Sequence, residues 1–273
     1  MQLCLHMTTS ASAGYRAALE GWARAGIALV ELDATLLDAF LATDTIGAAR
    51  RVLVDNGLMA VHAAVGVKGL LEPGPDHEAA IACLTRRLDL FAALGVTKVY
   101  APAIGSRRLA IEEYAIVADN MRRAGEVARS FGMVFSVEFV RSSSYMSTLP
   151  TALRLARQAA HPNVGVVLDC YHFWSGLNRG EDLDEIRPGE IQHVHFQDVP
   201  DLPREWLDSD SRVIAGDGVA PLEMTLRTLA ARGYDGPLSV ELFLPTFRDR
   251  DPYEMAREIR CKSESVMRNA GVH

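Results

Sequence analysis

The sequence predicts an α/β fold, a closed (β/α)8 barrel, and three observations support this prediction. The chain has 273 residues, a usual length for one barrel of this kind. Short apolar segments alternate with longer amphipathic ones along the chain, as parallel strands and their covering helices do. Glycine often precedes an apolar segment, as at Gly26, Gly57, Gly95 and Gly132, where a helix can end in a left-handed conformation.

Eight short apolar segments are predicted to be strands, because each is bounded by glycine or polar residues and is too short for a typical helix. These segments cover residues 2–6, 27–32, 58–63, 98–103, 134–138, 164–168, 191–196 and 237–241. Helical patterns cover 14–25, 45–56, 77–94, 111–131, 148–159, 222–232 and 252–269, with only a weak pattern at 182–186. We therefore expect a single barrel domain over residues 1–273, with an open parallel sheet as the main alternative.

The composition disfavours some classes of partner and location. A net charge of −7 and the absence of a long Lys/Arg run disfavour nucleic acid and anionic membrane surfaces as partners. The four cysteines are irregularly spaced and form no C-x-x-C pair, which favours a reducing, cytoplasmic location over a disulfide framework. The sequence shows no signal-peptide pattern and no apolar run of membrane-spanning length. Many barrels form homo-oligomers, and the sequence leaves this open.

Polar residues end four successive predicted strands near the C-terminus. They are Glu138, Asp169, His195 and Glu241. Because chemistry in such barrels takes place at the C-terminal ends of the strands, we expect these side chains to converge at one side of the mouth. Three carboxylates and an imidazole suit one divalent ion, such as Mn, Zn, Co, Fe or Mg. The sequence therefore predicts a metal site, since burying these carboxylates together without a cation would be costly.

Each member of this set also has a purely structural interpretation. A single glutamate at a strand end is usually solvated or caps a helix, but four converging residues are hard to explain in that way. His193 and His195 share strand parity, so one of them can be a packed histidine. His195 is the preferred ligand because it lies nearer the end of its strand.

Further polar residues near predicted strand ends are candidates for binding substrate. His6, Glu31 and His62 end the first three strands and would line the other half of the mouth. His172 follows Asp169 closely and can donate a hydrogen bond to substrate, shuttle a proton, or only orient a metal ligand. Two more candidates are Trp174, which can stack on a sugar face or serve a subunit contact, and Arg212, which can hold substrate or form a loop salt bridge.

These strand ends resemble the xylose-isomerase-like barrel superfamily of sugar phosphate isomerases and epimerases. The matching segments are V-E-F-V at 137–140, V-V-L-D-C-Y-H-F at 166–173, H-V-H-F-Q-D at 193–198 and S-V-E-L-F at 239–243. Within this superfamily the chain is most similar to the inosose isomerases over nearly its whole length. The resemblance implies that Glu138, Asp169, His195 and Glu241 bind the metal.

The chain departs from the inosose isomerase pattern at three positions. Leu244 stands where those enzymes tend to carry arginine, His62 stands where a small or amide residue is common, and Trp174 adds a large ring. These departures keep a lyase of the same superfamily open as an alternative, either an inosose dehydratase or an enzyme that cleaves keto-glycosides with a partner subunit. A metal-dependent DNA-repair endonuclease and a non-catalytic sugar-binding barrel are weaker alternatives, because no basic stripe is present and the four-residue set is intact.

The main expectation is therefore a divalent-metal-dependent isomerase or epimerase acting on a ketose, an inosose or a related small polyhydroxylated ketone. The metal would chelate the ketone oxygen and the neighbouring hydroxyl, so that removal of the intervening proton gives a metal-stabilised ene-diolate. Glu138 and Glu241 are the candidate acid and base, with His172 next. Returning the proton to another carbon or face gives isomerisation or epimerisation, and loss of a β-hydroxyl gives dehydration.

Overall fold

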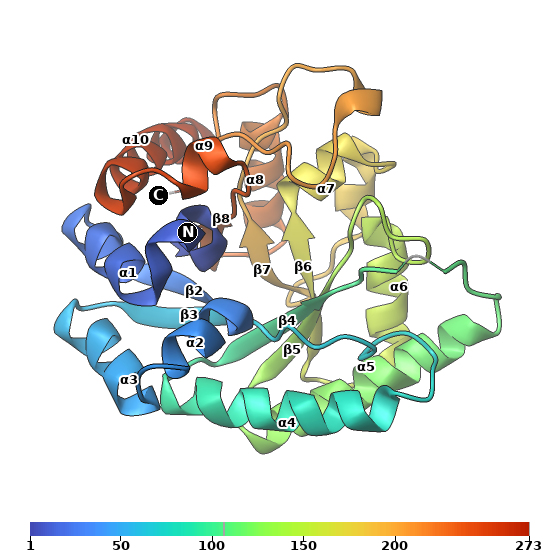
Figure 1. The fold of residues 1–273 in the computed structure, drawn as a ribbon. Helices are drawn as coiled ribbons and strands as arrows, with labels where there is room; N and C mark the ends of the chain where they lie inside the picture. Colours follow the sequence, from blue (N-terminus) through green and yellow to red (C-terminus); the bar gives the residue numbers. More distant parts are fainter. Residues whose placement is uncertain (106, 273) are drawn as a thin grey trace.

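Eight parallel strands close into a barrel in sequence order (Figure 1). The computed structural model of the chain describes residues 1–105 and 107–272, so that Ser106 and His273 of the predicted 1–273 domain lie outside the described residues. The strands are β1 (Gln2–His6), β2 (Leu29–Asp33), β3 (Met59–Ala64), β4 (Lys98–Pro102), β5 (Val134–Glu138), β6 (Val164–Asp169), β7 (Ile191–His195) and β8 (Pro237–Val240). Pairing of β8 with β1 closes the sheet, so the barrel prediction is confirmed and the open sheet is excluded.

The predicted helices are present and cover the outside of the barrel. They are α1 (Gly14–Arg24), α3 (Ile46–Asp55), α4 (His77–Ala93), α5 (Glu113–Ser130), α6 (Leu149–Ala159), α8 (Leu222–Ala231) and α10 (Pro252–Ala270). In Figure 1, α4 and α5 lie along the lower edge, whereas α1 packs beside α10 on the left, which brings the two ends of the chain together. In the part of the chain that the structure describes, no helix combines the length and apolar character needed to cross a bilayer.

Short helical segments in the loops extend this pattern. The α-helical ones are α2 (Ala34–Leu41), α7 (Cys170–Ser175) and α9 (Pro245–Arg248), and the 3-10 ones are η1 (Met7–Ala13), η2 (Gly180–Glu185) and η3 (Arg204–Trp206). Of these, only η2 overlaps a predicted segment, the weak pattern at 182–186. The others are too short for a helical period to stand out in the sequence.

Local chemistry sets where the elements begin and end. Thr45, Thr148 and Asp251 accept hydrogen bonds from backbone N–H groups in the first turns of α3, α6 and α10, as N-cap residues do. The four glycines expected at helix ends, Gly26, Gly57, Gly95 and Gly132, all have positive φ, between 65° and 83°. A side chain would strain the backbone at these turns, so glycine fixes where each helix gives way to the next strand.

The main hydrophobic core lies between the strands and the surrounding helices. Phe135 of β5 is fully buried there, together with Phe91 of α4 and Met121 of α5. Because side chains alternate along a strand, the neighbours of Phe135 in β5 point into the barrel instead. Ser136 and Glu138 therefore occupy the barrel interior, where the candidate site lies.

We predict that Phe135→Ala lowers the free energy of unfolding by about 3–5 kcal/mol, because the substitution leaves a cavity in a packed core. Urea unfolding followed by circular dichroism measures this change. Ile111→Ala is the control, since Ile111 is 85% exposed and its truncation should change stability by no more than about 0.5 kcal/mol. Equal losses in the two variants would contradict this description of the core.

Candidate metal centre and active site

Four side chains meet inside the C-terminal end of the barrel. Glu138, Asp169 and His195 are the last residues of β5, β6 and β7, and Glu241 directly follows β8. Strand register pairs Asp169 with His195, whereas Glu138 pairs with Val167 and His195 also pairs with Ser239, two residues before Glu241. One ligand atom from each of the four residues lies within 4.8 Å of the others. We call Glu138, Asp169, His195 and Glu241 the quartet.

The imidazole of His195 is the centre of the quartet. Its Nδ1 lies 2.8 Å from Glu138 Oε1 and 3.4 Å from Glu241 Oε2. The same nitrogen lies 3.5 Å from Asp169 Oδ2. Its other nitrogen, Nε2, points away from these carboxylates and lies 3.1 Å from Glu31 Oε1. His195 and Asp169 are fully buried, and Glu138 and Glu241 nearly so, which makes the electrostatic interactions among them strong.

Arg212 supplies a permanent positive charge beside the quartet. Its guanidinium donates to Glu241 Oε2, and its Nη2 lies 3.2 Å from Asp169 Oδ2. The same Nη2 donates to His172 Nε2 at 3.0 Å. Arg212 also lies over the ring of Phe243, 4.5 Å from its centroid. The sequence left two interpretations of Arg212, substrate binding or a loop salt bridge. In the structure, Arg212 is buried and contacts two carboxylates of the quartet.

Asp198 organises the loop that carries Arg212. Its carboxylate accepts hydrogen bonds from four backbone N–H groups, which belong to Val199, Gly216, Gly218 and Ala220 at 2.8–3.2 Å. Its backbone N–H donates to the carbonyl of Val213 at 2.8 Å. Gly218 fits closely against this carboxylate, because a Cβ there would lie 2.5 Å from Asp198 Oδ1. The absence of a side chain at Gly218 therefore allows the loop to pack against Asp198.

The carboxylates of the quartet differ in their affinity for protons. Burial and the neighbouring carboxylates raise the pKa of Glu138 to about 7, although His195 opposes this shift. Burial also disfavours ionisation of Asp169 and Glu241, but Arg212 outweighs it and holds the pKa of both below the ordinary values. The quartet therefore contains two carboxylates that stay ionised and one that can exchange a proton near neutral pH.

The donor set of the quartet fits a divalent cation. Burial disfavours the charged imidazole, but Glu31, Glu241 and Glu138 raise the pKa of His195 well above its ordinary value. The surrounding carboxylates thus favour a proton on His195, and burial, reinforced by Glu241 and Asp169, favours a proton on Glu138. Three carboxylate oxygens and one imidazole nitrogen are ligands that several divalent metals accept. A cation would replace these protons in balancing the charge.

A second group of polar side chains lies deeper in the barrel. Glu31 of β2, His62 of β3 and His193 of β7 are buried and in mutual contact. His62 Nδ1 lies 2.9 Å from Glu31 Oε1, and His193 Nε2 lies 2.9 Å from Glu31 Oε2. The structure thus places His195, and not His193, among the carboxylates of the quartet.

The structure brings some of the predicted substrate-binding residues to the quartet and leaves others away from it. His6 Nε2 lies 3.7 Å from Glu241 Oε1, and His172 reaches the quartet through Arg212. His62 lies in the deeper group with Glu31. Trp174 is not brought to the quartet, because its indole N–H donates to Thr225 of α8 at 3.0 Å and its ring packs against Phe173.

Tyr100 and Gln197 join the site without a role foreseen from the sequence. Tyr100 lies on β4, with its hydroxyl 3.4 Å from His6 Nε2 and its ring stacked on His62. Gln197, which lies in the H-V-H-F-Q-D segment, donates to Asp169 Oδ2 at 2.7 Å. The parity of strand 98–103 was the available signal for Tyr100, since alternate residues of that strand face the barrel interior.

Proteins of known structure or function share this fold. The solved structure of the IolI protein with a bound zinc atom superposes with a TM-score of 0.91, at 21% identity, over 100% of this chain and 99% of that one. An inosose isomerase of Halalkalibacterium halodurans is 30% identical over 50% of this chain, and a 3-dehydroshikimate dehydratase of Pseudomonas putida is 30% identical over 60%. These matches span 48% and 26% of the two relatives' own lengths.

Curated relatives of this chain include cyclitol and sugar isomerases, epimerases and dehydratases, so an enzymatic role is supported. A family match extends over residues 19–262 and therefore includes every member of the quartet. The chain belongs to the xylose isomerase-like TIM barrel family.

Proposed function

We propose that this protein is a divalent-metal-dependent isomerase or epimerase of a small polyhydroxylated ketone, either a ketose or an inosose. The observation that carries the proposal is the buried quartet, in which a carboxylate with a pKa near neutrality lies beside an ionised one. Relatives named inosose isomerase and ketose 3-epimerase support this reaction class.

Glu138, Asp169, His195 and Glu241 would hold one divalent ion, which fits the zinc atom bound in the similar IolI structure. When bound, the ion would polarise the ketone of the substrate and acidify the adjacent C–H group. Its identity is left open by the donor set, because mixed carboxylate and imidazole sites accept several metals.

Glu138 is the preferred group to remove the substrate proton. A general base must reach the proton that it removes through a free oxygen, and in the metal-free protein burial raises the pKa of Glu138, whereas the pKa values of Asp169 and Glu241 are lowered. Its Oε1 is engaged by His195, whereas Oε2 makes no hydrogen bond with a described residue. Glu138 can therefore hold its place in the quartet through one oxygen and exchange a proton through the other.

Arg212 is suited to stabilising the negative charge that develops on the substrate, and Glu241 is suited to accepting a proton. Arg212 donates to Glu241 and lowers its pKa despite burial, so Glu241 stays an ionised carboxylate that can accept a proton in the alternate direction. The guanidinium Nε has no hydrogen-bond partner among the described residues. A buried donor of this kind can stabilise negative charge on an ene-diolate oxygen.

His172 is suited to binding a substrate oxygen. Arg212 can only donate, so His172 Nε2 must accept its hydrogen bond and the proton of the neutral ring must lie on Nδ1. Burial lowers the pKa of His172 to about 4, with Arg212 contributing, so the ring is neutral at pH 7. Its Nδ1 is buried without a partner among the described residues. We therefore assign His172 as a hydrogen-bond donor to substrate rather than a proton shuttle.

Dehydration is the second candidate reaction, and the similarity to 3-dehydroshikimate dehydratases favours it. It begins with the same removal of a proton beside a ketone, after which a β-hydroxyl leaves instead of a proton returning. The same residues serve both reactions, so the substrate and the group that protonates the leaving oxygen decide the outcome. Product analysis separates them, because only dehydration gives an unsaturated product.

We predict that metal binding releases protons and weakens as the pH falls through about 7. Below this pH, Glu138 is protonated in the metal-free protein, and His195 also carries a proton because its pKa is raised. Each proton displaced weakens zinc binding about tenfold per pH unit below the corresponding pKa. Calorimetric zinc titrations at several pH values, in buffers of different ionisation enthalpy, count the released protons. A pH-independent affinity would contradict this prediction.

We predict that the zinc-loaded or manganese-loaded protein exchanges the proton beside the ketone for deuterium in D2O. The test panel is 2-keto-myo-inositol, several ketohexoses and 3-dehydroshikimate, followed by NMR. Glu138→Gln should slow exchange by about 10²–10⁴-fold, because the amide cannot act as the base.

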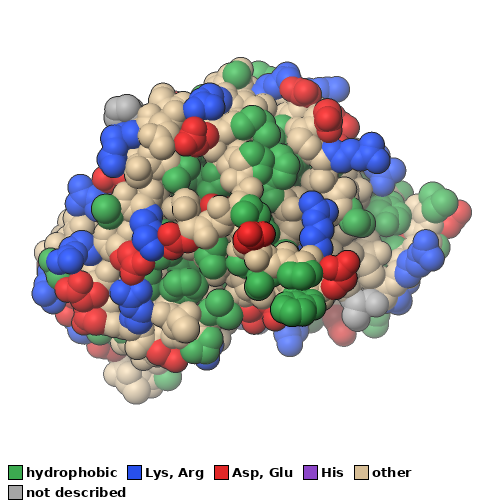
Figure 2. All heavy atoms as spheres, turned by 90° about the horizontal axis from the view of Figure 1, so that it is seen from above, with side chains coloured by type: hydrophobic (Ala, Val, Ile, Leu, Met, Phe, Trp, Pro, Cys, Tyr) green, Lys and Arg blue, Asp and Glu red, His purple; other side chains and the backbone are tan. Residues whose placement is uncertain are grey.

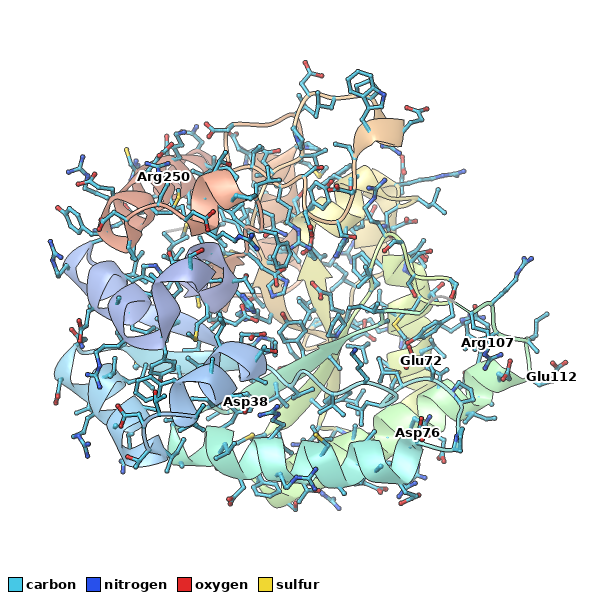
Figure 3. The ribbon with its side chains drawn as sticks, viewed as in Figure 1. Asp38, Glu72, Asp76, Arg107, Glu112 and Arg250 are labelled. Carbon is cyan, nitrogen blue, oxygen red and sulfur yellow. The ribbon has the colours of Figure 1, made fainter. Side chains whose placement is uncertain are left out.

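Glu112→Gln is the matched control, because Glu112 is exposed on the segment between β4 and α5, at the outer edge of the molecule (Figure 3). This variant should exchange at the wild-type rate. Metal binding without exchange of any substrate would refute the proposed reaction, and an equal loss in both variants would refute the role of Glu138. The product signals then distinguish isomerisation, epimerisation and dehydration.

A further inference from the structure

Glu31 is the common partner of three buried imidazoles. His62 and His193 each approach one of its oxygens at 2.9 Å, and His195 Nε2 approaches Oε1 at 3.1 Å. All four residues are at most 1% exposed. A carboxylate that is surrounded by three imidazole nitrogens is placed to accept a hydrogen bond from each of them. Each of the three rings therefore directs an N–H group toward Glu31.

This contact decides which nitrogen of His195 is available to a metal. If Nε2 carries the proton donated to Glu31, a neutral imidazole has its lone pair on Nδ1. Nδ1 is the nitrogen that faces Glu138, Asp169 and Glu241. We propose that Glu31 is a positioning residue, which fixes His195 in the Nε2-protonated tautomer and turns Nδ1 toward the quartet. This inference rests on the proposed metal-dependent function.

His62 and His193 hold Glu31 in the orientation that this role needs. Their rings stack with centroids 3.9 Å apart and engage opposite oxygens of the carboxylate. His62 also stacks on Tyr100 at 5.0 Å. Both carboxylate oxygens are thus fixed by partners from β3 and β7, which prevents Glu31 from turning away from His195. Outer carboxylates that accept from a ligating histidine commonly orient the ring and strengthen metal binding.

A second metal site at Glu31, His62 and His193 is the competing explanation, since their ligand atoms also lie within 4.8 Å of one another. In the structure both oxygens of Glu31 are already engaged by imidazole nitrogens. The two explanations differ in the number of ions bound. Positioning by Glu31 requires one ion per chain, whereas a second site requires two.

The test is calorimetric zinc titration of the metal-free protein, with wild type compared with Glu31→Gln and Ser136→Ala. We expect one ion per chain in all three, with affinity weakened about 10–100-fold in Glu31→Gln and unchanged in Ser136→Ala. Ser136 is the matched control because it is also buried in the barrel interior and its Oγ has no hydrogen-bond partner among the described residues. Thermal melting of each metal-free protein reports whether the fold is retained.

Nitrogen-15 NMR of the zinc-loaded protein, labelled at histidine, supplies a readout that a purely structural role would not change. In wild type, the resonances of His195 should show a protonated Nε2 and a metal-bound Nδ1, and Glu31→Gln should alter this pattern. If Glu31→Gln fails to fold, His62→Gln takes its place, because it removes one ring that fixes Glu31. Its zinc affinity should fall roughly 3- to 10-fold.

Unchanged affinity and an unchanged His195 pattern in the variants would overturn the positioning role while leaving the proposed function intact. Two ions in wild type, with one lost in Glu31→Gln, would overturn it in favour of a second metal site. Absence of zinc binding in the wild-type protein would refute the proposed metal-dependent function itself, and the positioning role with it.

Discussion

Repulsion among three buried carboxylates is the constraint around which the rest of the site is arranged. Glu138, Asp169 and Glu241 have ligand atoms within 4.8 Å of one another inside the barrel. Two like charges about 4 Å apart repel by about 4 kcal/mol at an effective dielectric constant of about 20. Without a cation, the protein meets this cost with Arg212, a protonated His195 and a raised pKa at Glu138. An added divalent ion would replace the protons.

The positive charge of Arg212, which offsets the repulsion among these carboxylates, comes from a loop that is distant from most of them in the sequence. Asp198, shortly after β7, accepts hydrogen bonds from backbone N–H groups of Gly216, Gly218 and Ala220 and so holds the returning loop that carries Arg212. Figure 2 shows acidic and basic side chains intermixed around the rim of one face, with hydrophobic side chains toward its middle. On this face, the electrostatics favour a small polar substrate over a nucleic acid backbone.

The sequence could predict the quartet because two regular features determine it. Side chains alternate along a strand, and parallel strands of a barrel end at the same face, so a polar residue at the end of each apolar segment points to one site. Trp174 could not be placed in this way. Asp169 caps α7 through the N–H of His172, and residues two apart on a helix lie on nearly opposite sides. His172 therefore points to Arg212, and Trp174 points to α8.

Contacts between residues of different strands could not be predicted from the sequence either. Glu31 and His62 were expected at the mouth beside the substrate, since each ends an apolar segment. Their actual level depends on the strand register, which shifts between Val30 and Glu31 where β2 pairs with β3. A register shift changes which side chains share a level in the barrel. Nothing local in the sequence marks that shift, so the contacts among Glu31, His62 and His193 emerge only in three dimensions.

The deeper polar group would be hard to explain by stability alone. Branched apolar side chains usually fill the layers of such a barrel, and replacing a buried charged network by apolar residues is often neutral or stabilising. An apolar layer below His195 would close the barrel as well, but it would leave the imidazole without an acceptor for Nε2–H. The ring could then bind protons at either nitrogen and rotate away from the carboxylates. The proposed role of Glu31 in orienting His195 would therefore account for the cost of burying Glu31 with its histidines.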